Sequence, residues 1–555
     1  MNLTDYGKDI QCQVLVYGGT VAGIAAALAA SRMGCKTILI ERGDHFGGMM
    51  ASGLGAIDTL RENAFGGIFW EFLKRTREYY IETYGPESDQ YRLTYDGFFM
   101  EAHVAERILG DMLSSQNELQ GLKRLELIEV IKQGNLVEAT IYKNRDTGER
   151  IRVSHAMAID GTYEGDLAAA AGVVCRTGRE GRAEHQERFA GVIFFDPRHY
   201  KQEIRPESTG EPSQHMQANC FRVTLSDDPK RIRFSKPASY KELYQDYYRD
   251  LLHDFDRGRI RHLNEIVWSN PLANHKYCIN GHIEALTSPN LAELSVDWAE
   301  GDWGKREQLY NYYKEYTEGL FYFLQNDLAV PTVPRVDAFR FGLPPDEYLQ
   351  DGNFPWQLYV RQGRRIIGEY VITEHDSIPE AGRQRPRLHK DTIGVYEHGF
   401  DSHPCRRRNS KDAVLTTSDG FDLLEGVIYF KSKMNSLNRP ATIPYRAIVP
   451  EKVDGLLVPT ALSATSVAYS SIRMEPVWMS TGQAAGVAAA QAIAQQVPVR
   501  RVDTRRLQQT LVKQRQVLAF FRDLSLEDPA FESIQLKVIE DDYPDYDLAL
   551  FRANG

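Results

Sequence analysis

Near the start of the chain, two short apolar runs flank an alanine-rich stretch. Residues 14–17 and 37–40 are apolar throughout, which is typical of strands buried on both faces. Residues 24–33 are rich in alanine and are followed by Gly34, a pattern that predicts a helix ending there. This strand–helix–strand order predicts the first unit of a parallel, doubly wound α/β sheet.

Later segments repeat these patterns. They predict a β-hairpin at 125–131 and 136–142, and a buried strand at 156–160 followed by a helix at 165–171. Towards the other end they predict a strand at 456–458, a long helix at 477–495 and an amphipathic tail at 504–521. Between them, aromatic, Pro, Arg and His residues become frequent and the periodic runs shorten. We therefore predict a discontinuous Rossmann-like nucleotide-binding domain with an inserted α+β domain. The two parts of the first domain are 1–180 and 425–500, the insertion is 181–424, and 501–555 forms a helical tail.

Composition and charge remove several classes of protein. Of the 555 residues, 42% are hydrophobic and 26% are charged, so the chain is not intrinsically disordered. The net charge of −10 argues against a nucleic-acid partner or an anionic membrane surface. Six scattered cysteines form no CxxC motif, and no His, Asp or Glu group has metal-ligand spacing, so we expect free thiols and no metal.

The segment before the first apolar run does not resemble a signal peptide. It carries Asp5, Lys8 and Asp9, and glycines interrupt the apolar stretch at 14–30, which is also short for a membrane span. Together with the expected free thiols, this favours a cytoplasmic protein. A homo-oligomer is compatible with the sequence, which leaves the oligomeric state open.

The turn after the first strand is a variant of the dinucleotide-binding loop GxGxxG. Its three glycine positions are occupied by Gly18, Thr20 and Gly23, so the middle glycine is absent. The loop still lies between a strand and a helix, and Glu41 closes the second strand. An acid at that position accepts the ribose hydroxyls of an adenosine and repels a 2′-phosphate, which disfavours NADP. The alternative is an ordinary crossover with a glycine turn.

A second glycine-rich stretch follows directly. It contains Gly47, Gly48, Gly53 and Gly55. Dense glycine after the ribose acid places backbone against a flat or phosphorylated ligand. NAD sites do not need such a second loop, whereas a flavin extending past the pyrophosphate does.

Several motifs together resemble the FAD-dependent oxidoreductases, and within them a GGT-type group often labelled xanthan-lyase-like. The motifs are VYGGTVAGIAAALAA, ILIER, HFGGMMASGLGAID, AIDGTYEGDLAAAAGV and IRMEPVWMSTGQAAGVAAA. In that group Thr20 is part of the pattern rather than a defect. The resemblance extends to about Leu518, and its FAD part is more specific than its substrate part.

The resemblance implies a glutathione-reductase-type FAD fold, distantly similar to succinate dehydrogenase flavoproteins. The first loop would hold the pyrophosphate, Glu41 the ribose, the second loop the ribityl chain and isoalloxazine, and the backbone before the last helix the flavin pyrimidine ring. The residues so placed against FAD are Gly18, Gly19, Thr20, Val21, Ala22, Gly23, Glu41, Arg42, Gly48, Met49, Ser52, Gly53, Leu54, Gly55, Leu127, Gly161, Arg473, Met474 and Glu475. The sequence departs from related flavoproteins at Thr460 and Ala461, where an acid often holds the ribityl chain.

Flavin dehydrogenation also needs a base for the substrate proton. His403, in a loop rich in Gly and Pro, is the preferred candidate, and His375 is the second; a surface or packing role is the alternative for each. Residues 362–373 have a helical pattern that would place Arg361 and Arg365 on one face, suited to an anionic substrate or else solvated. Arg473 would lie at the flavin edge.

The sequence thus predicts an FAD-dependent enzyme that takes a hydride from a small or medium organic substrate onto flavin N5. A flavin monooxygenase is the alternative within enzymes, although the late Gly-Asp signature of aromatic hydroxylases is absent. A protein that binds FAD without turnover of its own is the alternative outside them. The absence of cysteine clusters disfavours an electron-transfer subunit.

Overall fold

The computed structural model describes residues 8–59, 61–198, 202–283, 285–407, 412–430 and 437–540. At its centre is a parallel five-stranded sheet with the order β20-β8-β2-β3-β4. The strands are β2 (Val14–Tyr17), β3 (Thr37–Ile40), β4 (Leu119–Leu122), β8 (Met157–Asp160) and β20 (Leu456–Leu457). The predicted α/β class with a parallel sheet is confirmed, and strands from both ends of the chain share this sheet.

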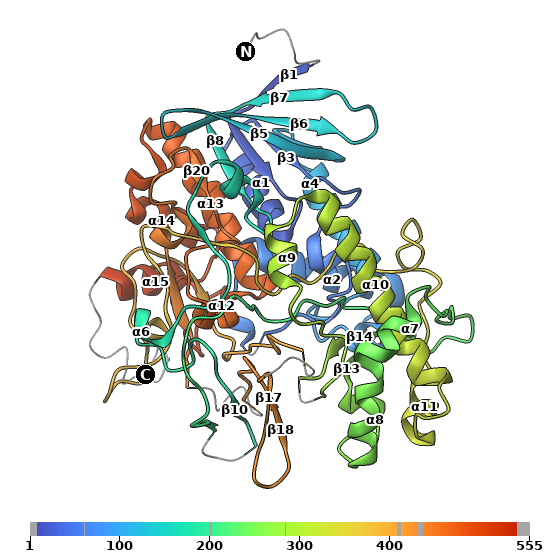
Figure 1. Cartoon of the computed structure of the whole chain (residues 1–555). Helices are drawn as coiled ribbons and strands as arrows, with labels where there is room; N and C mark the ends of the chain where they lie inside the picture. Colours follow the sequence, from blue (N-terminus) through green and yellow to red (C-terminus); the bar gives the residue numbers. More distant parts are fainter. Residues whose placement is uncertain are drawn as a thin grey trace.

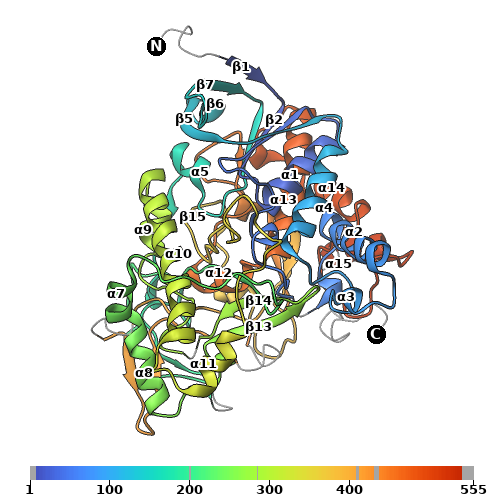
Figure 2. The same cartoon turned by 90° about the vertical axis from the view of Figure 1, so that its right-hand side faces the viewer.

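Two alanine-rich helices, α1 (Val21–Arg32) and α13 (Glu475–Gln495), pack against each other with small residues at the contact. A Cβ atom on Gly482 would lie 2.2 Å from the Ala22 carbonyl oxygen, and one on Gly486 would lie 2.2 Å from that of Ala26. Glycine at these positions therefore lets the two backbones touch. Both views show α1 and α13, which are far apart in the sequence, side by side (Figures 1 and 2).

A second sheet of four strands lies beyond the parallel sheet, near the first described residues (Figure 1). A buried cluster joins the two sheets, with Leu15 and Ile38 from the parallel sheet and Val137 and Val153 from the second. The predicted hairpin is present as an antiparallel pair. The strands are β1 (Lys8–Gln11), β5 (Leu125–Gln133), β6 (Leu136–Asn144) and β7 (Arg150–Ser154).

Several further helices come from the same parts of the chain, and α2 (Gly67–Tyr84), α4 (Ala102–Ser114) and α14 (Thr504–Lys513) pack against α1 or α13. The predicted amphipathic tail is helical only to Lys513. The further helices also include α3 (Asp89–Arg92), α5 (Asp166–Ala170), α12 (Ser466–Ile472) and α15 (Phe531–Glu540). Among the described residues, no helix is both long and apolar enough to cross a membrane.

The middle of the chain contains the long helix α10 (Trp303–Asn326) and an antiparallel sheet with the order β12-β14-β13. Figure 2 shows α10 running from beside α9 (Ser295–Glu300) towards α8 (Arg249–Asp256) and α11 (Thr332–Phe339). The other principal elements are β12 (Thr224–Ser226), β13 (Val267–Leu272), β14 (Lys276–Gly281), α6 (Arg182–His185) and α7 (Tyr240–Leu243).

Short strand pairs complete the described structure. They are β9 (Cys175–Arg176) with β15 (Arg365–Ile366), β10 (Phe195–Asp196) with β11 (Glu203–Ile204), β16 (Thr392–Tyr396) with β19 (Ala441–Pro444), and β17 (Val414–Thr416) with β18 (Asp422–Leu424). The helix predicted at 362–373 is wrong, because this stretch is irregular apart from β15 and Glu374–Asp376 forms a 3₁₀ turn after it. A Cβ atom on Gly363 would lie 2.5 Å from the Tyr163 carbonyl oxygen, so the segment runs against another backbone instead of coiling.

Candidate functional site

The loop between β2 and α1 explains why threonine replaces the middle glycine. Gly18 has φ +102°, and a Cβ atom on Gly23 would lie 1.9 Å from the Gly18 carbonyl oxygen, so both positions require glycine. Thr20 has an ordinary φ of −69° and caps α1: its hydroxyl accepts from the Gly23 N–H at 3.3 Å and donates to the Gly161 carbonyl at 2.6 Å. The loop thus forms a capped helix N-terminus suited to an anion.

Glu41 follows β3 and faces this loop. Its carboxylate accepts hydrogen bonds from the backbone N–H groups of Gly19, at 2.6 Å, and Gly43, at 2.7 Å. Burial raises the pKa of Glu41, and the two N–H donors oppose that shift. The carboxylate is therefore held in place by backbone, at the edge of a cleft.

That cleft has an empty volume of about 1280 Å³, part of it open to solvent. Gly18, Thr20 and Glu41 line one side, and α10 contributes Trp303 on the other. The Arg42 guanidinium lies 4.1 Å from the centre of the Trp303 ring, which joins the two sides. Sequence reasoning missed the contribution of α10, because nothing in the spacing of residues brings position 303 to position 42.

His45 is a second feature of the cleft that the sequence did not reveal. Its ring stacks on Trp356, with 5.0 Å between ring centres. Its Nδ1 lies 2.8 Å from a Glu106 carboxylate oxygen and its Nε2 lies 3.2 Å from one of Asp351. Hydrogen bonds to Asp351 and Glu106 raise the pKa of His45 to about 9, so the ring is a cation at neutral pH.

The second glycine loop, at 47–55, lies in close contact with the first glycine loop and with residues from the middle of the chain. A Cβ atom on Gly48 would lie 2.5 Å from the Tyr163 hydroxyl, and one on Gly53, whose φ is +98°, would lie 1.8 Å from the Arg222 carbonyl oxygen. The Ser52 hydroxyl accepts from the backbone N–H of Gln357 at 2.9 Å. The glycines are needed for these backbone approaches.

The second loop also meets the start of α13. The Met49 N–H donates to the Tyr163 hydroxyl at 3.0 Å, and that hydroxyl donates to the Glu475 carboxyl group at 3.1 Å. Burial raises the pKa of Glu475 to about 8, so this carboxyl is largely uncharged at neutral pH. Two segments more than 400 residues apart are thereby joined by one tyrosine.

Two predicted catalytic residues lie together around Asp401. Arg473 donates from Nη2 to the Asp401 carbonyl at 2.9 Å, and the same nitrogen lies 3.6 Å from the Asp401 carboxylate. The His403 Nε2 lies 3.7 Å from the other oxygen of that carboxylate. Both His403 and Arg473 are buried. Arg473 directly precedes Met474 in the chain, and its contact with Asp401 links His403 to this segment.

The remaining predicted residues lie elsewhere. Arg365 is buried in an ion pair with Glu180 at 2.6 Å and donates to backbone carbonyls, which is a structural role. His375 is exposed, and its Nε2 lies 3.0 Å from the His185 carbonyl oxygen. Leu127 packs into the cluster between the two sheets beside Tyr17, a residue that lines the cleft.

A group with metal-ligand geometry also arises from distant residues. Glu101, His103 and Glu347 bring ligand atoms within 4.8 Å of one another. The Lys276 ammonium already lies between the acids, 2.6 Å from Glu101 and 2.9 Å from Glu347. A bound cation would have to displace that ammonium, so we interpret the group as a buried ion-pair network.

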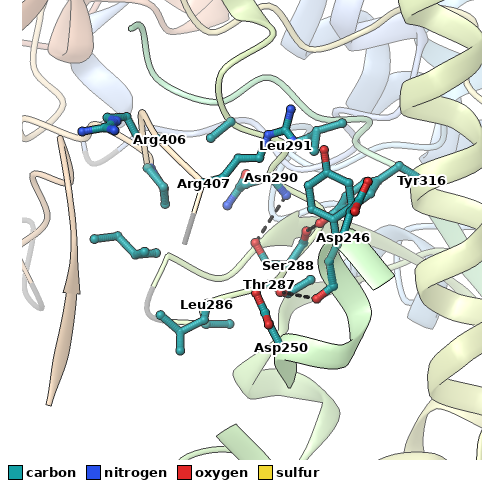
Figure 3. A pocket seen from close by; sticks show the side chains of 15 residues that line it. Asp246, Asp250, Leu286, Thr287, Ser288, Asn290, Leu291, Tyr316, Arg406 and Arg407 are labelled. Carbon is teal, nitrogen blue, oxygen red and sulfur yellow. Dashed lines mark hydrogen bonds between the residues drawn. The ribbon is translucent and has the colours of Figure 1, made fainter. Parts of the chain in front are cut away.

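A smaller cavity of about 450 Å³ lies apart from the glycine loops, and Figure 3 shows Arg406 and Arg407 above it and Leu286 below. Arg407 is paired with Glu293, its Nε 3.0 Å from a carboxylate oxygen. None of the residues that the sequence places against FAD lines this cavity.

The residues of the large cleft, together with the second glycine loop and the start of α13, which lie outside its lining, fit FAD. The capped N-terminus of α1 suits a pyrophosphate, and the Glu41 carboxylate faces the cleft beside it. Gly48 and Gly53 remove side chains where the second loop passes its neighbours. The helix N-terminus at Glu475, with its carboxyl largely uncharged, suits the electron-rich edge of a flavin.

Comparison with solved structures gives only distant similarity. The myxobacterial chondrochloren halogenase CndH is 15% identical over 55% of this chain and 60% of its own, with a TM-score of 0.28. The Bacillus halodurans glycerol-3-phosphate dehydrogenase complexed with FAD is 14% identical over 34% of this chain and 43% of its own, with a TM-score of 0.20. L-Proline dehydrogenase from P. horikoshii is 14% identical over 32% of this chain and 26% of its own, with a TM-score of 0.18. The matched region spans less than two thirds of each of these proteins.

A search of curated proteins finds no match. The family described as FAD dependent oxidoreductase, however, matches residues 13–511, which include both glycine loops, Glu41, the residues around Asp401 and the start of α13. The chain therefore belongs to the FAD-dependent oxidoreductase family.

Proposed function

We propose that this FAD-dependent oxidoreductase is a dehydrogenase or oxidase that takes a hydride from a small or medium organic substrate. FAD would bind in the extended, glutathione-reductase-type orientation. The N-terminus of α1 would hold the pyrophosphate and Glu41 the adenosine ribose. The isoalloxazine would lie between the Gly48–Gly55 loop and the Arg473–Glu475 backbone.

The observation that carries this proposal is the meeting of distant segments at one place. The Met49 N–H, the Tyr163 hydroxyl and the Glu475 carboxyl form one hydrogen-bonded chain. Arg473, next to Glu475, contacts Asp401, which lies beside His403. A flavin held by the first two segments would therefore have a histidine and an arginine close to its ring.

The chemistry supplied by bound FAD is the acceptance of a hydride at N5. His403 is the proposed base, taking a proton from the substrate hydroxyl or amine at a ring nitrogen while Asp401 orients the ring. Arg473 holds Asp401 and keeps a positive charge beside the substrate. Glu475, largely uncharged, leaves the positive end of α13 unopposed.

We keep the predicted division of the chain as a proposal. The parts at 1–180 and 425–500 would hold FAD, the second part would also supply Arg473, and the insertion at 181–424 would supply His403. A reducing compartment such as the cytoplasm stays an expectation from the scattered cysteines of the sequence.

The test is an anaerobic screen of candidate substrates, in which reduction of the flavin is detected as a loss of its absorbance. With a substrate that bleaches the flavin, His403→Gln should slow the reduction by about 10²- to 10⁴-fold while the FAD content stays unchanged. The matched control is His375→Gln, a change at an exposed histidine that should leave the rate as it was.

Two outcomes would contradict the proposal. Equal rates of flavin reduction in His403→Gln and the wild type would show that His403 is not the base. Bleaching by NAD(P)H alone, with no organic donor able to reduce the flavin, would favour the monooxygenase alternative.

A further inference from the structure

Three buried arginines surround the ring of Tyr359. The guanidinium carbons of Arg361, Arg222 and Arg473 lie 4.9, 5.7 and 5.8 Å from the ring centre. All three side chains are at most 5% exposed. We call Arg222, Arg361 and Arg473 the arginine cluster.

Negative charge does not balance this cluster. Asp58 reaches Arg222 only at 3.6 Å, and Asp401 reaches Arg473 at the same distance. Arg361 forms no ion pair with any described carboxylate and donates instead to neutral groups, the Ala218 carbonyl among them. Buried charges are normally paired, so an uncompensated cationic cluster is costly unless it serves a ligand.

The guanidinium groups also retain unused donors. The Nε atoms of Arg222, Arg361 and Arg473, and Nη1 of Arg222, are buried without a hydrogen-bond acceptor. Burial, followed by repulsion from Arg473 and Arg222, lowers the pKa of Arg361. Buried guanidinium groups with unused donors are suited to binding an anion.

The cluster adjoins both segments proposed to hold the flavin. The Arg222 carbonyl is the backbone atom that Gly53 approaches. The Cys278 thiol contacts Arg222 at 3.4 Å and donates to the Gly53 carbonyl at 3.3 Å. Arg473 directly precedes Met474 and Glu475. An anion bound here would therefore lie next to the flavin and not at the pyrophosphate loop.

We propose that the arginine cluster binds the substrate and that the substrate is a carboxylate, whose negative charge is bound by Arg222, Arg361 and Arg473. This inference rests on the proposed function and specifies its substrate class. Guanidinium groups bind carboxylates through paired, charge-assisted hydrogen bonds, which would fix the substrate so that its oxidisable carbon faces the flavin.

The experiment titrates the FAD-loaded protein with acetate, benzoate and succinate, and with the corresponding neutral amides, at constant ionic strength. Binding is followed by the shift of the flavin absorption spectrum. At least one carboxylate should give a saturable shift, and its amide should not. Arg361→Gln should weaken that binding by about 10- to 100-fold.

Asp58→Asn provides a second test with the opposite sign. The Asp58 side chain is 34% exposed, so the substitution is well tolerated sterically, and removing its charge should tighten carboxylate binding. Arg446→Gln is the control, because Arg446 is paired with Asp391 at the surface and should have no effect.

Each result has a defined meaning. If no carboxylate shifts the spectrum, or if the amides bind equally well, the carboxylate proposal is overturned while FAD binding stands. A change in the flavin reduction potential of Arg361→Gln without any carboxylate binding would assign the cluster to the flavin itself and also overturn it. Failure of the protein to retain FAD would instead contradict the proposed function.

Discussion

Replacing Glu41 by glutamine removes the charge of this side chain but keeps its shape. In the native protein both carboxylate oxygens accept backbone hydrogen bonds, from Gly19 at 2.6 Å and from Gly43 at 2.7 Å. The glutamine amide has one oxygen, so one of these N–H groups would face an NH₂ group. Hydrogen bonds to charged groups contribute about 1.5–3 kcal/mol, and the loop should lose stability by that order.

The same change affects FAD binding, because an amide accepts ribose hydroxyls less strongly than a carboxylate. A loss of about 1.5–3 kcal/mol corresponds to an FAD affinity weakened by roughly 10- to 150-fold. The assay is titration of FAD into the apoprotein with quenching of flavin fluorescence. Glu78→Gln is the control, since Glu78 is exposed on α2 and does not line the cleft. Equal affinities in Glu41→Gln and Glu78→Gln would refute the ribose role.

Other substitutions test separate parts of the account. Gly23→Ala should abolish FAD retention, because its Cβ atom would lie 1.9 Å from a backbone oxygen. The control is Gly110→Ala in α4, where the new Cβ atom meets open space, and this change should raise the melting temperature slightly. The pKa of His45 is raised to about 9, so its stabilising contribution is full below pH 6.5 and is lost as the pH rises through 9. His45→Gln should therefore lower the melting temperature at pH 6.5 and have little effect above pH 9; a constant difference would contradict the ion pairs. Lys276→Met leaves buried carboxylates unpaired and should cost about 3–5 kcal/mol in denaturant unfolding, and a neutral outcome would refute the network.

The sequence predicted the parallel sheet because strong local signals mark its first strands. Val14–Tyr17 and Thr37–Ile40 are apolar on both faces, and an alanine-rich helix lies between them. The strand at Leu119–Leu122 was not predicted, since its middle residues, Gln120 and Gly121, are exposed at the sheet edge and interrupt the apolar pattern. Thr20 is explained by its backbone conformation, which needs no glycine.

The arginines show where sequence reasoning fails. The spacing of Arg361 and Arg365 indicated a helix with one cationic face, yet the segment is irregular and the two side chains have different roles. Arg365 pairs with Glu180, whereas Arg361 joins Arg222 and Arg473 around one tyrosine. The residues of this cluster are more than 100 positions apart in the sequence, and no local sequence pattern shows that they meet in the fold.

The most direct test of the central claim is an experimental structure of the protein with FAD bound. We predict density for the adenosine ribose against Glu41 and for the isoalloxazine between Gly48–Gly55 and Arg473–Glu475. His403 and the arginine cluster should then face one side of the ring. Density for the dinucleotide elsewhere, or a ring turned away from Arg473 and His403, would contradict the account.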